Sequence, residues 1–516
     1  MKPRKYIIAL AISFLLLGMA GCKEQLEEVR PETSLDPSVI LADASSAYAL
    51  YNGVYNTFRG YQGTLFALGE MRSEIWANGL FTETEEPSFR QYWAQDFSQA
   101  NAPVSNWANF YSLLNRVNTV IKLFPKAPLN VATKNRYRAE MFGMRAYIYY
   151  TMLRTWGKVP ITTEPLEEIG DLTALYKERA GTDLVMKQIK ADIDSSMALI
   201  GSTVTYATPA NPSNNKRVYW NRAATLTLKG DVYIWSATHM GGGSTDLTTA
   251  KTALEEVKNN TALFGLQANY ADVFDPLKKN GNKEIIFSVS FEKDQAGLGS
   301  YGNFLVNTTQ RATLIFDPSA PVTIVSAYPY VGGANRVGLS ATMITKLTTG
   351  TPVDTRAKAT FRTMHNNSAP FALRGIMLTK FIGRADPISS SQIFDNDFPI
   401  YRYADVLLML AESKTKLGES PKAEIDAIRQ RAYGAGFVPF VSGTQTENMN
   451  AIIEEDLREF IGEGRYWWTL RRAGDSFVYS NISPTFISPA QSYKLLLPIT
   501  VSMLNGDPKL TQTTGY

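Results

Sequence analysis

The chain has 516 residues, of which 44% are hydrophobic and 19% charged, with a formal net charge of +4, and this composition excludes collagen, a coiled coil and wholesale disorder. Cys22 is the only cysteine, and His239 and His365 are the only histidines, so neither a disulfide framework nor a Cys- or His-rich metal centre can be assembled. We therefore expect no metal and no cofactor, and His-dependent catalysis is disfavoured.

Residues 1–21 have the features of an export signal. A basic stretch at 2–5 precedes the apolar run 7–17, which is too short for a transmembrane helix of about 20 apolar residues. Cys22 directly follows the small residues 20–21, and this resembles the bacterial lipobox, in which the cysteine is acylated and the chain is cut before it. The alternative is an ordinary secretory cleavage site with a chance cysteine.

Cleavage before Cys22 would remove three of the positive charges, leaving +4 − 3 = +1. Nucleic-acid binding then loses its support, because it depends on a basic surface that releases counterions from phosphates. Residues 23–38 are polar, contain two prolines and lack an apolar period, so we expect a tether between lipid and folded body.

Helical spacing of apolar residues dominates from residue 39 to about 260. Phe110, Leu113, Leu114, Val117 and Ile121 lie on one face of a helix, and similar sets occur within 142–153 and 185–197. Prolines and glycines separate these sets at helix–turn–helix intervals. The pattern predicts a scaffold of antiparallel helix pairs like a tetratricopeptide array, although no clean 34-residue consensus repeats.

The periodicity breaks between about 262 and 400, where a strand-like segment at 284–291 lies among long Gly-, Thr-, Asn- and Pro-rich stretches. Loops of this length are usually functional. Helical spacing returns from 403 onward. We therefore expect a mainly α protein, with a helical-repeat half at 39–260 and a loop-rich, variable half at 261–516 packed on that scaffold.

Four segments carry motifs that point to a family. They are RAYIYYTMLRTWGKVP (145–160), FPIYRYADVLLMLAE (398–412), EDLREF followed by EGRYWWTLRR (455–472), and LLLPI followed by NGDPKLTQTTGY (495–516). In this order, behind a lipobox, they resemble the motifs of the SusD/RagB family of outer-membrane nutrient-binding lipoproteins. The chain departs from the family pattern at Asp456 and Tyr466, where arginine is usual, and at Thr469, where aspartate is usual.

The resemblance implies a mostly helical fold with four tetratricopeptide-like helix pairs and no catalysis. It implies a lid over a TonB-dependent barrel of the SusC type, to which the protein delivers oligosaccharide nutrient or, in the RagB branch, peptide. It also implies attachment to the outer membrane through lipid on Cys22, facing the exterior. Lys23 and Glu24 resemble a tag for that outer face.

The acidic residues near the C-terminus have two interpretations. Glu455, Glu459 and Glu463 step by four and lie near Arg458 and Arg465, which favours helix ends locked by ion pairs. A glycosidase would instead place two acids across a sugar, about 5–10 Å apart. Acids on one helix face stay on one side of any cleft, so we favour the lock.

Sugar sites combine flat rings with planar amides and carboxylates in a concave surface. Two polar, loop-like regions, 74–96 and 291–304, interleave aromatic residues with such groups. The candidate ligand-binding residues are Trp76, Asn78, Phe81, Tyr92, Trp93, Tyr301 and Asn303. Most aromatic residues on helix stripes belong to the core, but a core role is least compelling for these rings. The surface aromatic residues around 315–375 come next.

Two further patterns are weaker. Gly297, Gly299 and Gly302 match a dinucleotide fingerprint in spacing but lack a surrounding βαβ pattern. Residues 395–397 offer oxygen ligands for calcium without the rest of an EF-hand loop.

Glycan binding is the leading hypothesis. The alternatives are a peptide ligand on the same fold, a surface glycoside hydrolase, and a purely structural helical-repeat protein.

Overall fold

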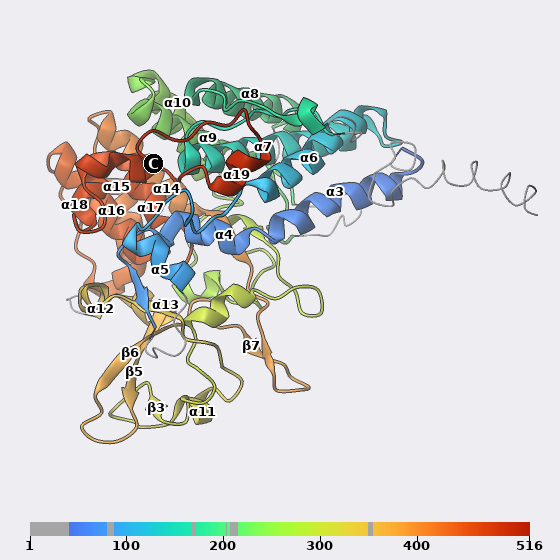
Figure 1. Cartoon of the computed structure of the whole chain (residues 1–516). Coiled ribbons are helices and arrows are strands. Elements are labelled where there is room, and N and C mark those ends of the chain that lie inside the picture. Colours follow the sequence, from blue (N-terminus) through green and yellow to red (C-terminus); the bar gives the residue numbers. More distant parts are fainter. Residues whose placement is uncertain (1–40, 80–86, 167–171, 203, 207–214, 349–353) are drawn as a thin grey trace, which may run out of the picture.

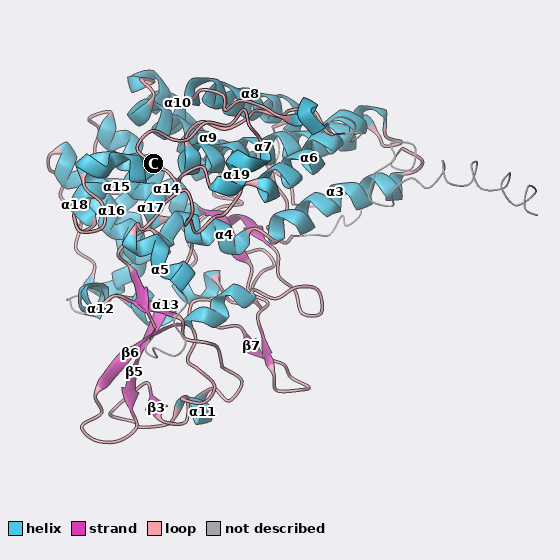
Figure 2. Cartoon of the chain, viewed as in Figure 1, coloured by secondary structure: helices cyan, strands magenta, loops and turns pink. Residues whose placement is uncertain are grey.

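The structure is a computed structural model that describes residues 41–79, 87–166, 172–202, 204–206, 215–348 and 354–516. Cys22 and Phe81 lie outside these ranges. Helices predominate and strands are few and short (Figure 2), so the predicted mainly α fold is confirmed. Within the described ranges, no helix has both the length and the apolar character needed to span a bilayer.

The first half of the described chain forms a stack of helices (Figure 1). They are α3 (Ala44–Arg59), α6 (Ala108–Leu123), α7 (Val131–Trp156), α8 (Thr182–Ile200), α9 (Arg222–His239) and α10 (Gly243–Asn259). From α6 to α10 each helix packs against the next, and α3 packs against α6. The predicted scaffold of helix pairs is therefore present.

Local signals set the ends of these helices. The side chain of Asn130 accepts the backbone N–H of Thr133 at 2.9 Å and caps α7. Gly157 ends the same helix with a φ of +72°, which favours glycine. Asn221 caps α9 in the same way as Asn130 caps α7.

Helices of the C-terminal part extend the stack. They are α14 (Tyr403–Lys416), α15 (Lys422–Tyr433), α16 (Gln445–Phe460), α17 (Tyr466–Ala473), α18 (Asp475–Asn481) and α19 (Val501–Gly506). Helix α14 packs against α9, α10 and α16. A capping box between Thr444 and Glu447 begins α16.

A lobe of short strands and loops lies below the helical stack in Figure 1. Its strands pair antiparallel: β1 (Trp76–Asn78) with β4 (Val337–Leu339), β7 (Arg384–Ala385) with β8 (Gln392–Ile393), and β5 (Phe361–Asn366) between β3 (Leu314–Ile315) and β6 (Leu373–Leu378). The short helices α11 (Ile324–Ala327), α12 (Ala341–Thr348) and α13 (Thr355–Thr360) lie among them. A further antiparallel pair, β2 (Ile285–Val289) with β9 (Phe398–Arg402), packs against α3, α9 and α14 of the stack. The strand predicted at 284–291 is β2.

The segment after α3 joins the stack to the lobe. It comprises α4 (Gln62–Phe66), a π-helical turn η1 (Ala67–Met71), β1 and α5 (Pro87–Ala94). Six 3-10 helices complete the described elements: η3 (Phe124–Lys126), η4 (Leu172–Leu175), η5 (Tyr270–Val273), η6 (Gly299–Phe304), η7 (Gly434–Gly436) and η8 (Pro489–Leu495).

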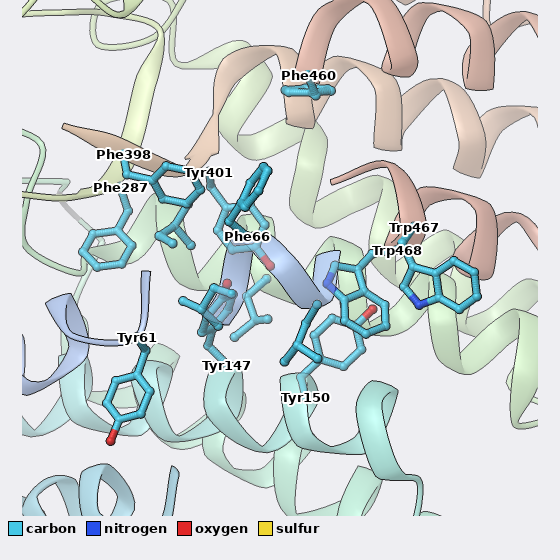
Figure 3. Close-up of a cluster of buried hydrophobic side chains, with 14 of the residues drawn as sticks. Tyr61, Phe66, Tyr147, Tyr150, Phe287, Phe398, Tyr401, Phe460, Trp467 and Trp468 are labelled. Atoms are coloured by element: carbon cyan, nitrogen blue, oxygen red, sulfur yellow. The ribbon is translucent and has the colours of Figure 1, made fainter. Parts of the chain in front are cut away.

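One large core connects distant parts of the chain (Figure 3). Phe66 of α4, Tyr147 and Tyr150 of α7, Phe460 and Trp468 all lie in this cluster. A second, small core of Leu305, Val306, Leu314, Ile324, Val331, Met364 and Met377 lies in the lobe. The helical stack and the α4–η1 segment thus share one apolar interior.

Candidate functional site

The acidic residues near the C-terminus are buried in an ion-pair network. Arg402 Nη1 donates to Glu459 Oε1 at 2.7 Å, and Arg402 Nε donates to Glu463 Oε2 at 2.8 Å. Arg402 also binds Glu284 at 2.6 Å, and Lys380 Nζ binds Glu463 at 2.8 Å. These five residues are at most 4% exposed. The predicted ion-pair lock is confirmed, although its partners lie far away in the sequence.

The electrostatics of this network oppose an acid–base role. Burial alone would raise the pKa of Glu459, but the guanidinium groups of Arg431, Arg402 and Arg356 outweigh it and hold that pKa well below its ordinary value. Because a general acid must keep a proton near neutral pH, Glu459 is unsuited to that task.

Two other buried carboxyl groups have pKa values raised to about 7, chiefly by burial: Glu70 and Asp456. Neither faces a space that would hold a sugar. Glu70 accepts the backbone N–H groups of Gly462 and Gly464, both at 2.7 Å. Asp456 lines a cavity of about 30 Å³, enough for about one or two water molecules.

Asp456 and Thr469 also explain the departure from the family motif. Arginine and aspartate are usual at these positions, and here the hydroxyl of Thr469 donates to Asp456 Oδ2 at 2.9 Å. A neutral donor therefore holds this carboxyl group.

Four of the five predicted ligand-binding rings are in the core. Trp76 is 2% exposed, Tyr301 1%, Tyr92 6% and Trp93 7%. The expectation that they lie in open, loop-like surroundings is wrong. Their contact with a ligand stays a prediction.

The physical reason is coverage by elements that are distant in sequence. Trp76 lies edge-on to Phe304 at a centroid distance of 4.9 Å, and β1 is covered by its pairing with β4. The hydroxyl of Tyr301 donates to the backbone carbonyl of Gly462, and its ring lies 5.7 Å from that of Phe66. The two predicted regions do meet, but as a hydrophobic cluster.

The two predicted amide residues are more accessible. Asn78 and Asn303 are half-buried, and Asn303 Nδ2 donates to the carbonyl of Ser300 at 3.0 Å. Asn303 is thereby bonded to Ser300, a residue of the groove described next, without lining that groove itself. Phe81 lies outside the described residues.

An open groove of about 740 Å³ lies where the end of α3 and the start of α4 face the loop 291–300. One wall consists of Asn56, Arg59, Gly60, Gln62 and Gly63, and the other of Phe291, Gln295, Ala296, Gly297, Leu298, Gly299 and Ser300. Helices α3 and α4 run along the side of the helical stack that faces the lobe (Figure 1). The groove therefore lies at the junction of stack and lobe.

The loop wall is held in place by backbone bonds. Glu292 and Ala296 exchange two N–H···O bonds at 3.2 Å, and the N–H of Leu298 donates to the carbonyl of Phe394 at 2.8 Å. Across the groove, the hydroxyl of Ser300 donates to Gln62 Oε1 at 2.8 Å. The two walls are thus in fixed contact at one end.

The groove combines amide groups with one cation. Gln62 is only 3% exposed, and its Nε2 has no hydrogen-bond partner in the part of the chain that the structure describes. Asn56 and Gln295 are exposed, so their amides are available to hydroxyl groups. This arrangement suits a polyhydroxylated ligand.

The sequence pointed to the loop wall of the groove and not to the wall formed by α3 and α4. The Gly-rich stretch 297–302 drew attention, and it lies in the groove and at the start of η6. Asn56, Arg59 and Gln62 were missed because they resemble the polar face of an ordinary helix. The available signal was the pair Gly60 and Gly63, which interrupts the helix beside them.

Both acidic residues of the segment considered for calcium are paired with cations. Asp395 pairs with Arg384 at 2.7 Å and Asp397 with Lys279 at 2.8 Å. Among the described residues, no group of three or more acidic, His or Cys side chains could hold a metal ion.

Comparisons with known proteins agree on one family. The model described as "SusD family" matches residues 362–516, and the one described as "Starch-binding associating with outer membrane" matches 28–219. The solved structure of NanU from B. fragilis is 30% identical, with 95% of this chain and 100% of that chain covered and a TM-score of 0.83.

Two curated relatives extend the comparison. SusD-like protein P38 of Formosa agariphila is 22% identical, with the whole of both chains covered. Starch-binding protein SusD of Bacteroides thetaiotaomicron is 29% identical over 25% of this chain and 23% of its own length.

Proposed function

The chain belongs to the SusD family, and from this we propose that it binds a glycan nutrient at the outer-membrane surface and delivers it to a TonB-dependent barrel of the SusC type. The observation that carries the proposal is the amide-lined groove between α3–α4 and the loop 291–300. The starch-binding names of the matching family model and of the Bacteroides relative support a carbohydrate as the ligand class.

The size and the chemistry of the groove fit this ligand. Its volume of about 740 Å³ lies within the usual range for small-molecule sites, about 300–1,000 Å³. The amides of Asn56, Gln62 and Gln295 can each donate to and accept from sugar hydroxyls.

We propose binding without turnover. The described residues that line the groove include no carboxylate, whereas glycoside hydrolysis generally needs two acids across the bond. The buried carboxylates of the ion-pair network are neutralised by cations inside the core and do not face the groove.

Membrane attachment through Cys22 is part of the proposal. Three acyl chains would hold the protein stably, since two already suffice, and residues 23–38 would act as the tether. Replacement of Cys22 by Ser should release the protein from membranes and abolish fatty-acid labelling. A variant that still sediments with outer membranes and takes up label would contradict the anchor.

Titration calorimetry with a panel of oligosaccharides tests the ligand. We expect micromolar affinity, roughly 8 kcal/mol, for at least one member, with no product after overnight incubation. Gln62→Met and Gln295→Ala should each weaken binding about tenfold, because each removes an amide that faces the ligand. Gln430→Ala, on the exposed side of α15, is the matched control.

The remaining outcomes separate the alternatives. Binding of peptides but of no glycan would favour the peptide hypothesis, and product formation would favour the hydrolase. If both groove variants bind like the wild type, the site lies elsewhere, and the half-buried rings of Phe316, Tyr328 and Tyr330 in the lobe come next. A barrel gene beside this one would support the delivery step.

A further inference from the structure

We propose that the glycan held in the groove is anionic, and that a carboxylate or sulfate group on one sugar unit pairs with the guanidinium of Arg59. This inference rests on the proposed function, because it names the ligand class of the same groove. Carboxylate and sulfate share the relevant chemistry, a compact anion with several acceptor oxygens.

The charge of the groove carries the inference. Among the described residues that line it, Arg59 is the only one with an ionisable side chain. It is half-buried, and within the described residues it has neither an ion pair nor a hydrogen bond. Two other half-buried arginines are paired, Arg465 with Asp405 at 2.8 Å and Arg384 with Asp395 at 2.7 Å. Arg59 therefore presents an unmatched cation to the groove.

The opposite wall supplies no counter-charge. The loop carries two acidic residues, Glu292 and Asp294, and neither lines the groove. Glu292 is bound by Lys216 at 2.6 Å and by Lys279 at 3.4 Å. Asp294 is exposed on the turn between the two ends of the loop. No described carboxylate of this loop therefore neutralises Arg59 in the groove.

Gln62 provides a second, independent observation. Its Oε1 accepts the hydroxyl of Ser300, which fixes the orientation of the amide, and its Nε2 has no partner in the described chain although the side chain is 3% exposed. A buried donor without an acceptor is costly, and an acceptor on the ligand would remove that cost. An unpaired guanidinium and an unpaired amide donor in one groove together favour an acceptor-rich, negatively charged group.

A purely structural role of Arg59 makes a different prediction. Arg59 is the last residue of α3, where any cation interacts favourably with the carboxyl end of the helix. That role needs a positive charge only. Pairing with a carboxylate or sulfate also uses the planar fork of the guanidinium, which lysine lacks. The variant Arg59→Lys therefore separates the two roles.

The probes are two matched pairs of oligosaccharides. Oligogalacturonate is compared with its methyl ester, which has the same sugars without the charge. A sulfated galacto-oligosaccharide is compared with its desulfated form. Calorimetry is done on the full-length mature protein, with circular dichroism and thermal unfolding as the check on folding.

We expect the charged member of at least one pair to bind tenfold or more tightly than its neutral partner, and that preference to fall as salt rises from 50 to 500 mM. Arg59→Gln should abolish the preference, so that the charged and the neutral member bind with equal affinity. Arg59→Lys should retain only part of it. Arg374→Gln, an exposed arginine on β6, should behave like the wild type. The pair that shows the preference identifies carboxylate or sulfate as the source.

The inference is overturned if neutral and charged members bind equally, or if Arg59→Gln keeps the preference. In both cases the proposed function stands, because a glycan is still bound. If no carbohydrate in either this set or the broader panel is bound, the proposed function fails and the anionic ligand with it.

Discussion

The carboxylate of Glu70 accepts the backbone N–H of Gly464 at 2.7 Å, across 394 positions of sequence. Its other oxygen accepts the N–H of Gly462 at the same distance. The two segments touch so closely that a Cβ on Gly69 would lie 1.9 Å from the carbonyl oxygen of Gly464. This contact fixes η1 and the preceding α4, and hence the position of Gln62 in the groove.

Glu70→Gln should destabilise the protein by about 1–3 kcal/mol, because the amide can accept only one of the two N–H groups and turns a donor toward the other. Urea unfolding at pH 8, where Glu70 is ionised, measures the loss. Glu178→Gln, an exposed residue, is the control. Equal stability of Glu70→Gln and the wild type would show that the contact is dispensable.

Asp456 should make stability depend on pH. Burial raises its pKa to about 7, well above the ordinary value of about 3.9 for aspartate. The folded protein therefore binds this proton more tightly than the unfolded chain does. The stabilisation is complete below about pH 4 and is lost as the pH rises through 7, by on the order of 2–4 kcal/mol.

Asp456→Asn removes the titrating carboxyl group, so the free energy of unfolding of the variant should fall less between pH 4 and 8. The variant should therefore be more stable than the wild type at pH 8. Part of the slope will remain, because the pKa of Glu70 is raised in the same direction. Urea midpoints at several pH values give the comparison, with the exposed Asp183→Asn as control. An unchanged slope in Asp456→Asn would refute the assignment.

Arg402→Met should cost about 3–5 kcal/mol or prevent folding, because it leaves the carboxylates of Glu284, Glu459 and Glu463 buried without their shared partner. Chemical denaturation, or the soluble yield if the variant does not fold, provides the measurement. The exposed Arg374→Met should lose little. A change below about 1 kcal/mol in Arg402→Met would mean that the other cations suffice.

Tyr301→Phe tests whether a predicted site residue reaches the ligand. The variant keeps the ring and removes the hydroxyl that donates to the carbonyl of Gly462, so we expect a loss of about 1 kcal/mol of stability and unchanged affinity for glycan. Tyr330→Phe, whose ring is half-buried, is the matched control. Weaker glycan binding without a loss of stability would show that Tyr301 contacts the ligand.

The fold could be predicted because its signals are local. The apolar spacing of Phe110, Leu113 and Val117 predicts the buried face of α6 directly. The spacing of Val185 and Ile189 does the same for α8. The α-helical character of the stack follows from such repeats without knowledge of any tertiary contact.

The site could be predicted only in part, because its parts meet through tertiary structure. The spacing of Glu459 and Glu463 indicated ion pairs, but nothing in it pointed to Arg402 or Lys380 as partners. Polar neighbours suggested an exposed Trp76, yet β4 covers the strand that carries it. The groove likewise forms where α3 and α4 meet a loop from the middle of the chain.

The contact between Glu70 and the glycines at 462 and 464 also constrains when this part of the chain can fold. Synthesis proceeds from the N-terminus, so the segment around Glu70 emerges early and must wait for its donors until nearly the whole polypeptide exists. A nascent chain that ends before residue 460 lacks the two N–H groups that the Glu70 carboxylate accepts. Limited proteolysis of such truncated chains should therefore cut around residues 60–72. One wall of the ligand groove, built in part by α4, therefore depends on a segment near the end of the chain.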